Sequence, residues 1–242
     1  PLCAGLADAL ESAGFRVFGP RKAAAELEGS KKFAKEIMQA AGVPTAACAV
    51  FTDADKACAY VRRKGAPIVI KADGLAAGKG VTVAETVEQA EDAIKDALGG
   101  AFGDAGRRVV IEDFLVGEEA SILALIDGEH VVLLASSQDH KRVFDGDLGP
   151  NTGGMGAYSP APVATDAVLD IVRKEVYGRT LAELKKRGIT YKGVLYAGLM
   201  IDNGKPSVVE FNCRFGDPET QAVLARWDGD IIPALEACID GT

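Results

Sequence analysis

The sequence predicts an α+β fold, and three observations support this prediction. Between residues 47 and 98, short apolar runs alternate with stretches that have a helical apolar stripe. Between residues 109 and 135, and again between 191 and 211, strand-like runs are joined by tight turns. The repeating strand and helix pairs indicate an α/β or α+β architecture, and beyond residue 109 the predicted strands outnumber the helices.

The first 51 residues predict two helices and two strands. A helix over 2–13 ends at Gly14, and residues 15–18 are expected to be a short strand before a turn. Residues 1–20 therefore resemble the end of an α/β domain that begins earlier. Ser30 is predicted to cap a helix that continues to Ala41 and ends at Gly42, followed by a strand over 47–51.

The remaining elements follow from the same signals. We expect helices over 53–63, 86–98 and 165–187, strands over 68–70, 81–83 and 109–111, and a helical end over 218–239 that breaks at Asp228 and Gly229. Two hairpins are predicted, over 120–135 and 191–211, and the second turns at Asn203 and Gly204. Residues 136–162 contain many glycines and little periodicity, which predicts a long functional loop.

Composition restricts the kind of protein this is. The 242 residues carry a formal net charge of −8, which argues against non-specific binding of nucleic acid. The sequence contains no apolar run long enough to span a membrane and no targeting leader at its start, so a cytoplasmic location without membrane contact is expected. The five cysteines form no C-x-x-C pair, which disfavours a disulfide framework and a structural zinc site.

A glycine-rich segment follows the predicted strand at 68–70. Lys71 stands at the end of that strand and Lys79 in the loop, where Gly74, Gly78 and Gly80 would let the backbone approach phosphates closely. The spacing fits neither a P-loop nor the dinucleotide fingerprint G-x-G-x-x-G. The alternative is an ordinary hairpin turn with solvated lysines.

A second constellation lies near the C-terminus. Because side chains alternate along a strand, Glu210 and Asn212 are expected on one face of the predicted strand over 208–212. One carboxylate and one amide oxygen suit Mg²⁺ that is also bound by substrate phosphates. The alternative is a solvent-exposed strand, which is weakened by the polar residues Arg214, Asp217 and Glu219 that follow at once.

Taken together, these segments resemble the ATP-grasp fold, in which ATP lies between two α+β subdomains. The resemblance implies an ATP-grasp domain over 21–242, with a smaller subdomain at about 45–113, and Mg²⁺ or Mn²⁺ as the metal. It implies that Glu210 and Asn212 bind that metal. The residues that it implies for ATP binding are Lys31, Lys71, Gly78, Lys79, Gly80, Glu112, Phe114, Leu115 and Glu119.

Two long segments, 136–162 and 210–221, point to one family with this fold. They resemble the glycinamide ribonucleotide synthetase family of ATP-dependent ligases. This resemblance implies glycine and 5-phosphoribosylamine as substrates, a monomer, catalytic roles for Arg214, Lys79 and Asp139, and further domains before and after these residues. The residues that it implies for substrate binding are Asp139, His140, Lys141, Asn151, Gly153, Gly154, Arg214, Asp217, Pro218 and Glu219. One departure is Gly198, where many ATP-grasp enzymes carry another metal-binding carboxylate.

The sequence bears on three other functions. A different ATP-grasp ligase, either another carboxylate–amine ligase or a biotin-dependent carboxylase component, would share the nucleotide residues but not the segment 139–157. A non-catalytic ATP-binding module would bind nucleotide without phosphoryl transfer. A nicotinamide oxidoreductase is disfavoured because its glycine spacing is absent, and a serine or cysteine nucleophile has no supporting motif.

Overall fold

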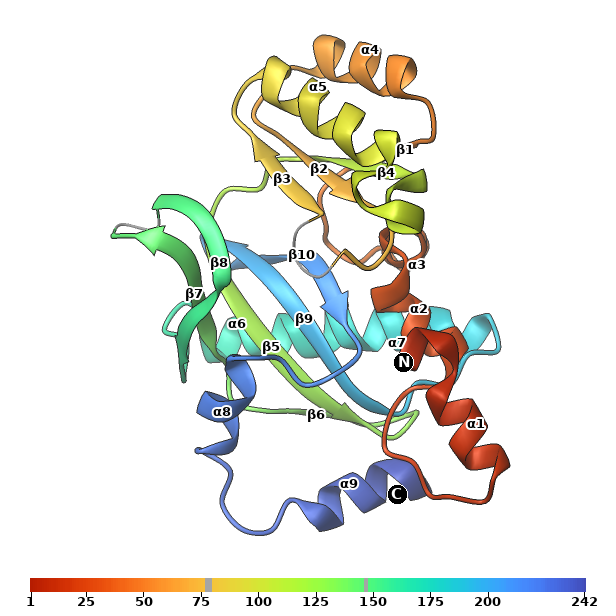
Figure 1. Cartoon of the computed structure of the whole chain (residues 1–242). Coiled ribbons are helices and arrows are strands. Elements are labelled where there is room, and N and C mark those ends of the chain that lie inside the picture. The colour runs from red at the N-terminus through yellow and green to blue at the C-terminus, as the bar shows by residue number, and fades with distance from the viewer. Residues whose placement is uncertain (77–79, 146–147) are drawn as a thin grey trace.

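The computed structural model describes residues 1–76, 80–145 and 148–242, and for residues 141, 142, 148, 150, 151, 153 and 154 it describes the backbone alone. Two four-stranded antiparallel sheets lie one above the other, and each has helices and a hydrophobic core of its own (Figure 1). A separate two-stranded ribbon stands beside the larger sheet. The predicted α+β class is confirmed.

The smaller sheet has the strand order β1-β4-β2-β3. Its strands are β1 (Cys48–Phe51), β2 (Ile68–Ala72), β3 (Val81–Ala84) and β4 (Val109–Asp113). Helices α4 (Ala54–Lys64) and α5 (Val87–Asp96) cover its outer face in Figure 1, and α5 leads through the short helices η2 (Ala97–Ala101) and η3 (Gly103–Arg107) into β4. The opposite face of the smaller sheet is turned toward the larger sheet (Figure 1).

Local capping explains where the two covering helices begin. The Asp53 carboxylate accepts a hydrogen bond from the Lys56 amide at the start of α4, at 2.9 Å. Thr86 and Gln89 form a reciprocal capping box at the start of α5. Apolar side chains of both helices then pack on Ile68 of β2 and its neighbours, which gives the small sheet a core separate from that of the larger one.

The larger sheet has the strand order β10-β9-β5-β6. Its strands are β5 (Glu118–Ile126), β6 (Val131–Leu133), β9 (Gly193–Asp202) and β10 (Lys205–Asn212). Asn203 and Gly204 both have positive φ, at 48° and 77°, which confirms the predicted tight turn between β9 and β10.

Helices cover both faces of this larger sheet. One face packs on α2 (Lys22–Gly29), α3 (Lys31–Ala41) and the continuous helical segment formed by α6 (Asp166–Ile171), η4 (Val172–Gly178) and α7 (Arg179–Lys186). The other face packs on α8 (Glu219–Leu224) and α9 (Ile232–Asp240). Because side chains alternate along β5, Ile122 faces the first set and Leu123 the second.

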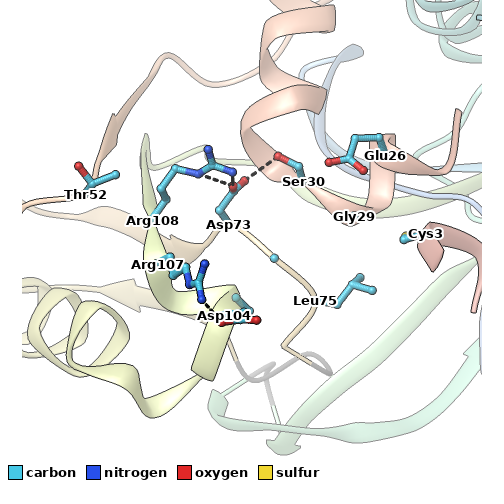
Figure 2. A pocket seen from close by; sticks show the side chains of 12 residues that line it. Cys3, Glu26, Gly29, Ser30, Thr52, Asp73, Leu75, Asp104, Arg107 and Arg108 are labelled. Atoms are coloured by element: carbon cyan, nitrogen blue, oxygen red, sulfur yellow. Dashed lines mark hydrogen bonds and ion pairs between the residues drawn. The ribbon is translucent and has the colours of Figure 1, made fainter. Parts of the chain in front are cut away.

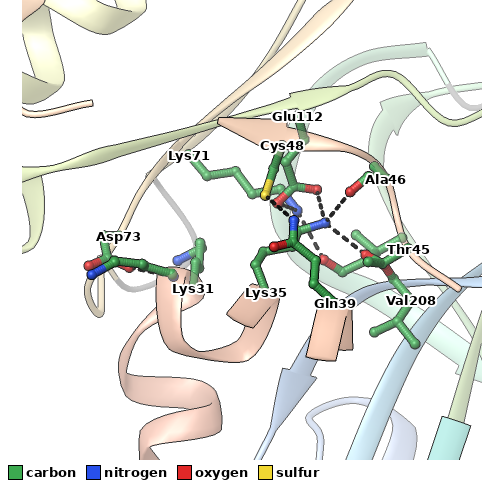
Figure 3. Close-up of polar contacts among 12 residues, drawn as sticks. Lys31, Lys35, Gln39, Thr45, Ala46, Cys48, Lys71, Asp73, Glu112 and Val208 are labelled. Carbon is green, nitrogen blue, oxygen red and sulfur yellow. Dashed lines mark hydrogen bonds and ion pairs between the residues drawn. The ribbon is translucent and has the colours of Figure 1, made fainter. Parts of the chain in front are cut away.

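Helix α3 lies between the two sheets and positions the site. The Ser30 hydroxyl accepts from the Phe33 amide at 3.1 Å and begins the helix, and Gly42, with φ of 65°, ends it. Ile37 and Met38 are buried in the core of the larger sheet. Helix α3 is therefore held against that core, while Lys31 and Lys35 extend toward the smaller sheet and the turn after β2 (Figure 3).

The prediction of a long irregular loop over 136–162 was wrong. Most of this segment forms an antiparallel ribbon of β7 (Gln138–Phe144) and β8 (Leu148–Tyr158), with register irregularities on either side of Arg142. The sequence of this segment has no regular apolar alternation, so sequence periodicity does not reveal the strand pairing.

The predicted strand over 15–18 was also wrong, since these residues pair with no strand among the described residues. They follow η1 (Leu2–Ala4) and α1 (Leu6–Ser12) and are fixed by side chains instead. The Phe18 ring lies 6.4 Å from the ring of Phe215, and the Arg16 guanidinium forms an ion pair with Asp240. Helix α2 was not predicted. Within the described residues, no helix is both long and apolar enough to cross a membrane.

Candidate functional site

Three charged side chains are buried together between α3 and the smaller sheet (Figure 3). The Glu112 carboxylate on β4 accepts from the Lys71 ammonium on β2 at 3.1 Å and from the Lys35 ammonium on α3 at 2.9 Å. Each of the three side chains is no more than 4% exposed. With both lysines charged and one carboxylate between them, this Lys35–Glu112–Lys71 cluster carries one excess positive charge, which favours an anionic ligand.

The same cluster joins the two sheets. Lys71 also donates to the Val209 carbonyl on β10, at 3.0 Å. Close by, the Thr45 hydroxyl donates to the Val208 carbonyl at 2.6 Å, and the Val208 amide donates to the Pro44 carbonyl at 2.8 Å. The strand that carries Glu210 is thus tied directly to the strand lysine of the smaller sheet.

Lys31 opens α3 and extends toward the same space. Its ammonium donates to the Gly74 carbonyl at 3.3 Å. Burial lowers the pKa of Lys31, the charge of Glu210 opposes that decrease, and the charge of Lys71 adds to it. Glu210 and Lys71 therefore both lie close enough to Lys31 for their charges to act on it.

Asp73 fixes the turn that follows Lys71 (Figure 2). Its carboxylate accepts from the Lys32 amide at 2.7 Å, from the Ser30 hydroxyl at 3.0 Å and from the Arg108 guanidinium at 2.9 Å. The Lys31 amide donates to the Asp73 carbonyl at 3.0 Å. A buried anion thus holds the positive end of α3 against the end of β2.

A cavity of about 640 Å³ opens beside this turn, lined by Gly29, Ser30, Asp73, Gly74, Leu75 and Arg108 among others (Figure 2). Among the described residues that line it, neither Lys71 nor Glu210 is present. The cavity therefore borders the glycine-rich segment and is distinct from the space that those two side chains share.

Glu210 and Asn212 leave β10 in alternate positions, as the sequence predicted, after an irregularity between Val208 and Glu210. Glu210 is half-buried and pairs across the sheet with Gly198, so the neighbouring strand offers no carboxylate at that point. The Asn212 amide oxygen lies 3.4 Å from the guanidinium of Arg214. In the described part of the chain, no group of three or more acidic, histidine or cysteine side chains is arranged so that it could hold a metal ion by itself.

This donor set fits a divalent ion that takes its other ligands from a polyphosphate and water. One carboxylate and one amide oxygen are hard ligands, and Mg²⁺ commonly takes one or two protein ligands in such sites.

Arg214 is aligned by a residue far away in the chain. Its guanidinium lies 3.0 Å from one oxygen of Glu28 on α2, whose other oxygen accepts from the Cys213 amide at 2.8 Å. Arg214 is itself exposed, so its remaining donors can reach a ligand. The two-point contact of Glu28 fixes the chain as it leaves β10.

A buried polar chain lies beneath the segment 216–219. The hydroxyl of Tyr196 lies 2.8 Å from the Ser121 hydroxyl and 2.8 Å from the carboxylate of Glu219, to which it donates. Burial, together with the charge of Glu219, raises the pKa of Tyr196, so it stays a donor at neutral pH. A Cβ on Gly216 would lie 2.4 Å from the second Glu219 oxygen, which explains a glycine there.

The structure describes only some of the other residues predicted for ligand binding. Gly78 and Lys79 lie outside the described residues, and the side chains of Lys141 and Asn151 are not described; Gly153 and Gly154 are placed in β8 by their backbone. A Cβ on Gly80 would lie 2.7 Å from that of Ala76, so close packing is a reason for that glycine.

The remaining predicted residues lie in three regions of the fold. Asp139 is buried in the ribbon, and the ring of His140 stacks on that of Tyr158, with centroids 5.6 Å apart. Phe114 and Leu115 lie on the link between the two sheets, and Glu119 lies at the start of β5. Asp217 and Pro218 form the turn before Glu219, the residue that opens α8.

Comparison with known families shows which family the chain belongs to. The model of the phosphoribosylglycinamide synthetase ATP-grasp (A) domain matches residues 29–220, which is most of the chain. The chain belongs to the phosphoribosylglycinamide synthetase family. Its ATP-grasp fold is confirmed with that assignment, and the described elements from Ser30 to Glu219 fall within the matched residues.

Relatives within the phosphoribosylglycinamide synthetase family are close in sequence. The chain is 60% identical to phosphoribosylamine–glycine ligase of Xanthomonas campestris pv. campestris, over all of the chain and 57% of that protein. It is 58% identical to the enzyme of the same name from Vibrio cholerae, again over all of the chain and 57% of that protein. The chain thus spans little more than half the length of these relatives.

Solved structures of other proteins share the fold of this chain. The crystal structure of phosphoribosylamine–glycine ligase from Thermotoga maritima is 39% identical and matches 93% of the chain and 57% of its own chain with a TM-score of 0.83. The biotin carboxylase domain of the Hydrogenobacter thermophilus 2-oxoglutarate carboxylase, solved with MgADP, ADP and bicarbonate, covers 98% of the chain and 50% of its own chain with a TM-score of 0.72. At 22% identity, the second likeness shows the fold alone.

Sequence reasoning missed several residues that this phosphoribosylglycinamide synthetase site uses. Lys35, Asp73, Tyr196 and Glu28 hold predicted residues in place through buried contacts between distant segments. A signal existed for Lys35, because it follows Lys31 by four residues and so shares its helix face. The contacts of Tyr196 with Glu219, and of Glu28 with Arg214, span more than twenty residues and have no local signature.

Proposed function

We propose that this chain is the ATP-grasp part of an ADP-forming ligase that joins glycine to 5-phosphoribosylamine. The observation that carries the proposal is that Lys71 is bonded to the strand of Glu210 and that Lys31 lies near the charges of both. The chain is also 60% identical to a phosphoribosylamine–glycine ligase over all of the chain and 57% of that protein. In this proposal, ATP lies between the sheets, with its adenine at the link that carries Phe114 and Leu115.

The reaction would have two steps. First, a glycine carboxylate oxygen attacks the γ-phosphorus of ATP and the bond to the β-phosphate oxygen breaks, which gives glycyl phosphate and ADP. Then the amine of 5-phosphoribosylamine attacks the glycyl carbonyl carbon, phosphate leaves, and the amide of glycinamide ribonucleotide forms after loss of a proton. Both steps need positioning and charge neutralisation more than a protein nucleophile.

The cationic side chains supply that neutralisation. Lys71 and Lys31 would hold phosphate oxygens, because the Lys71 side chain is buried between the sheets, Lys31 is half-buried beside it, and both lie near the strand that carries Glu210. Lys79 is proposed for the same work on the strength of the sequence alone. Arg214 would contact the transferring phosphoryl group, since Glu28 fixes one edge of its guanidinium and leaves other donors exposed.

Glu210 and Asn212 would hold a divalent ion, for which we propose Mg²⁺ with Mn²⁺ as an alternative. When bound, the ion would offset charge on the ATP phosphates. The protein's own contribution there is to align two hard oxygen ligands on one face of β10.

The acceptor pocket is proposed to lie by the β7–β8 ribbon and the turn before α8. Asp139 and Glu219 are buried carboxylates from these two segments, and the charge of each contributes to raising the pKa of Tyr196. We propose that glycine and 5-phosphoribosylamine bind on that side, with contacts from Asp217, Pro218, His140, Lys141, Asn151, Gly153 and Gly154. A cytoplasmic monomer that binds neither nucleic acid nor membrane remains part of the proposal.

The proposal is tested by following ADP release by the full-length protein with ATP, glycine and freshly formed 5-phosphoribosylamine. We expect turnover that requires both substrates. Bicarbonate replaces glycine in a parallel reaction. ADP release that depends on bicarbonate instead of glycine would favour a carboxylase component, and nucleotide binding without turnover in either mixture would favour a non-catalytic module.

A further inference from the structure

All three donors of the Lys35 ammonium are used within the protein. An ammonium has three donors, and those of Lys35 find the Glu112 carboxylate at 2.9 Å, the Thr45 hydroxyl at 2.7 Å and the Ala46 carbonyl at 3.1 Å. Its side chain is 3% exposed. Lys35 therefore has no donor left for a ligand, although it lies one helical turn from Lys31.

Lys71 differs in this respect. Within the described part of the chain, its ammonium has two acceptors, one Glu112 oxygen and the Val209 carbonyl. One donor is thus available to a ligand, and the contact with Glu112 can be exchanged for a phosphate oxygen. How firmly Glu112 holds Lys71 depends on how much of the carboxylate charge is neutralised elsewhere, because Lys35 and Lys71 bind opposite oxygens of the same group.

We propose that Lys35 is a positioning residue for nucleotide binding: it holds Glu112 and neutralises part of its charge, so that Lys71 can turn toward a phosphate. The inference rests on the proposed function, since it takes Lys71 as a phosphate ligand. Lys35 acts through Glu112 and does not touch the nucleotide.

Without Lys35, the buried Glu112 carboxylate has a single cationic partner, and Lys71 becomes that partner alone. A phosphate must then compete with a stronger ion pair for Lys71. If Glu112 is neutralised as well, the competition disappears and Lys71 is released again. Loss of Lys35 should therefore be repaired by a second change at Glu112.

The experiment is calorimetric titration of magnesium-ATP into the full-length protein and four variants. Lys35→Met should raise the Kd for ATP about tenfold, and the double variant Lys35→Met with Glu112→Gln should recover most of that loss, as expected for directly coupled residues. Lys32→Met is the matched control, because Lys32 lies on the exposed side of the same helix and its ammonium pairs with Glu36. It should leave the Kd unchanged.

A merely structural role gives a different pattern. It predicts that Lys35→Met lowers the melting temperature but leaves the Kd of the folded protein unchanged, or that the second change at Glu112 recovers nothing. Either result would overturn the inference. Should Lys35→Met not fold, Lys35→Gln carries the same test, since its amide can still donate to Glu112 without a charge.

Failure of the inference is separable from failure of the proposed function. Lys71→Met, the fourth variant, should weaken ATP binding whatever Lys35 does. If the wild-type protein binds no ATP, or if Lys71→Met binds it normally, the assignment of the phosphate site fails. If both behave as expected and Lys35→Met does not, the role of Lys35 alone fails.

Discussion

The ammonium of Lys71 lies 3.0 Å from the carbonyl oxygen of Val209, so a lysine of the smaller sheet is bonded to the strand that carries the proposed metal ligand Glu210. This contact crosses between two sheets whose hydrophobic cores are separate. The contact fixes the position of Lys71 relative to β10. The separate cores of the two sheets cannot do this, because each core holds only its own sheet.

Lys71→Met should therefore weaken nucleotide binding more than folding. Glu112 keeps Lys35 as its partner, so the variant leaves no buried carboxylate alone. We expect the Kd for magnesium-ATP to rise at least about tenfold, as for loss of a charged contact to a bound anion. Calorimetry on the folded variant measures this, and an unchanged Kd would remove Lys71 from the phosphate site.

Asp73→Ala should destabilise the fold. It removes the acceptor shared by the Ser30 hydroxyl, the Lys32 amide and the Arg108 guanidinium, at a site where Asp73 is only 4% exposed. The loss in the free energy of unfolding should be about 3 kcal/mol, measured by urea unfolding. Asp104→Ala is the control, since Asp104 pairs with Arg107 on the surface. Equal losses in both variants would contradict the role given to Asp73.

Tyr196→Phe should disturb the segment before α8. The variant removes the donor to Glu219 and leaves a carboxylate that is 2% exposed without that hydrogen bond. The free energy of unfolding should fall by about 2 kcal/mol. Ser121→Ala leaves the Tyr196–Glu219 hydrogen bond in place, so it should lower the free energy of unfolding by less. Thermal unfolding of both variants compares them, and a larger loss for Ser121→Ala would reverse the proposed order.

Cys213 should resist alkylation in the native protein. Burial raises the pKa of its thiol to about 12, so at pH near 8 very little thiolate is present. The half-buried Cys48 is expected to react faster despite its own raised pKa. Iodoacetamide labelling followed by mass spectrometry measures the order. Rapid native labelling of Cys213 would contradict its burial and reopen the possibility of a thiol nucleophile.

Much of the fold is readable in the sequence because its signals are local. Ser30 and Gly42 mark the two ends of α3, and Asn203 with Gly204 marks the turn before β10; each device acts within a few residues. The alternation that places Glu210 and Asn212 on one face is equally local. These predictions were confirmed because no distant contact overrides them.

The features that escaped prediction depend on distant partners. The segment 15–18 has strand-like residues, but among the described residues no strand pairs with it. The ring of Phe18 packs on Phe215 instead. The β7–β8 ribbon has the opposite character, since its pairing exists without an apolar pattern. Lys35 was overlooked because a lysine on a helix is usually solvated, and its burial depends on Glu112 of another element.

The proposed ATP and metal site is best tested by titration of ATP, with and without magnesium, into the full-length protein and its Glu210→Ala variant. We expect the wild-type protein to bind magnesium-ATP with a Kd in about the micromolar range. That binding should weaken strongly when magnesium is omitted or Glu210 is replaced. The proposed site would be wrong if a folded Glu210→Ala variant bound magnesium-ATP as tightly as the wild-type protein, or if the folded wild-type protein bound no nucleotide.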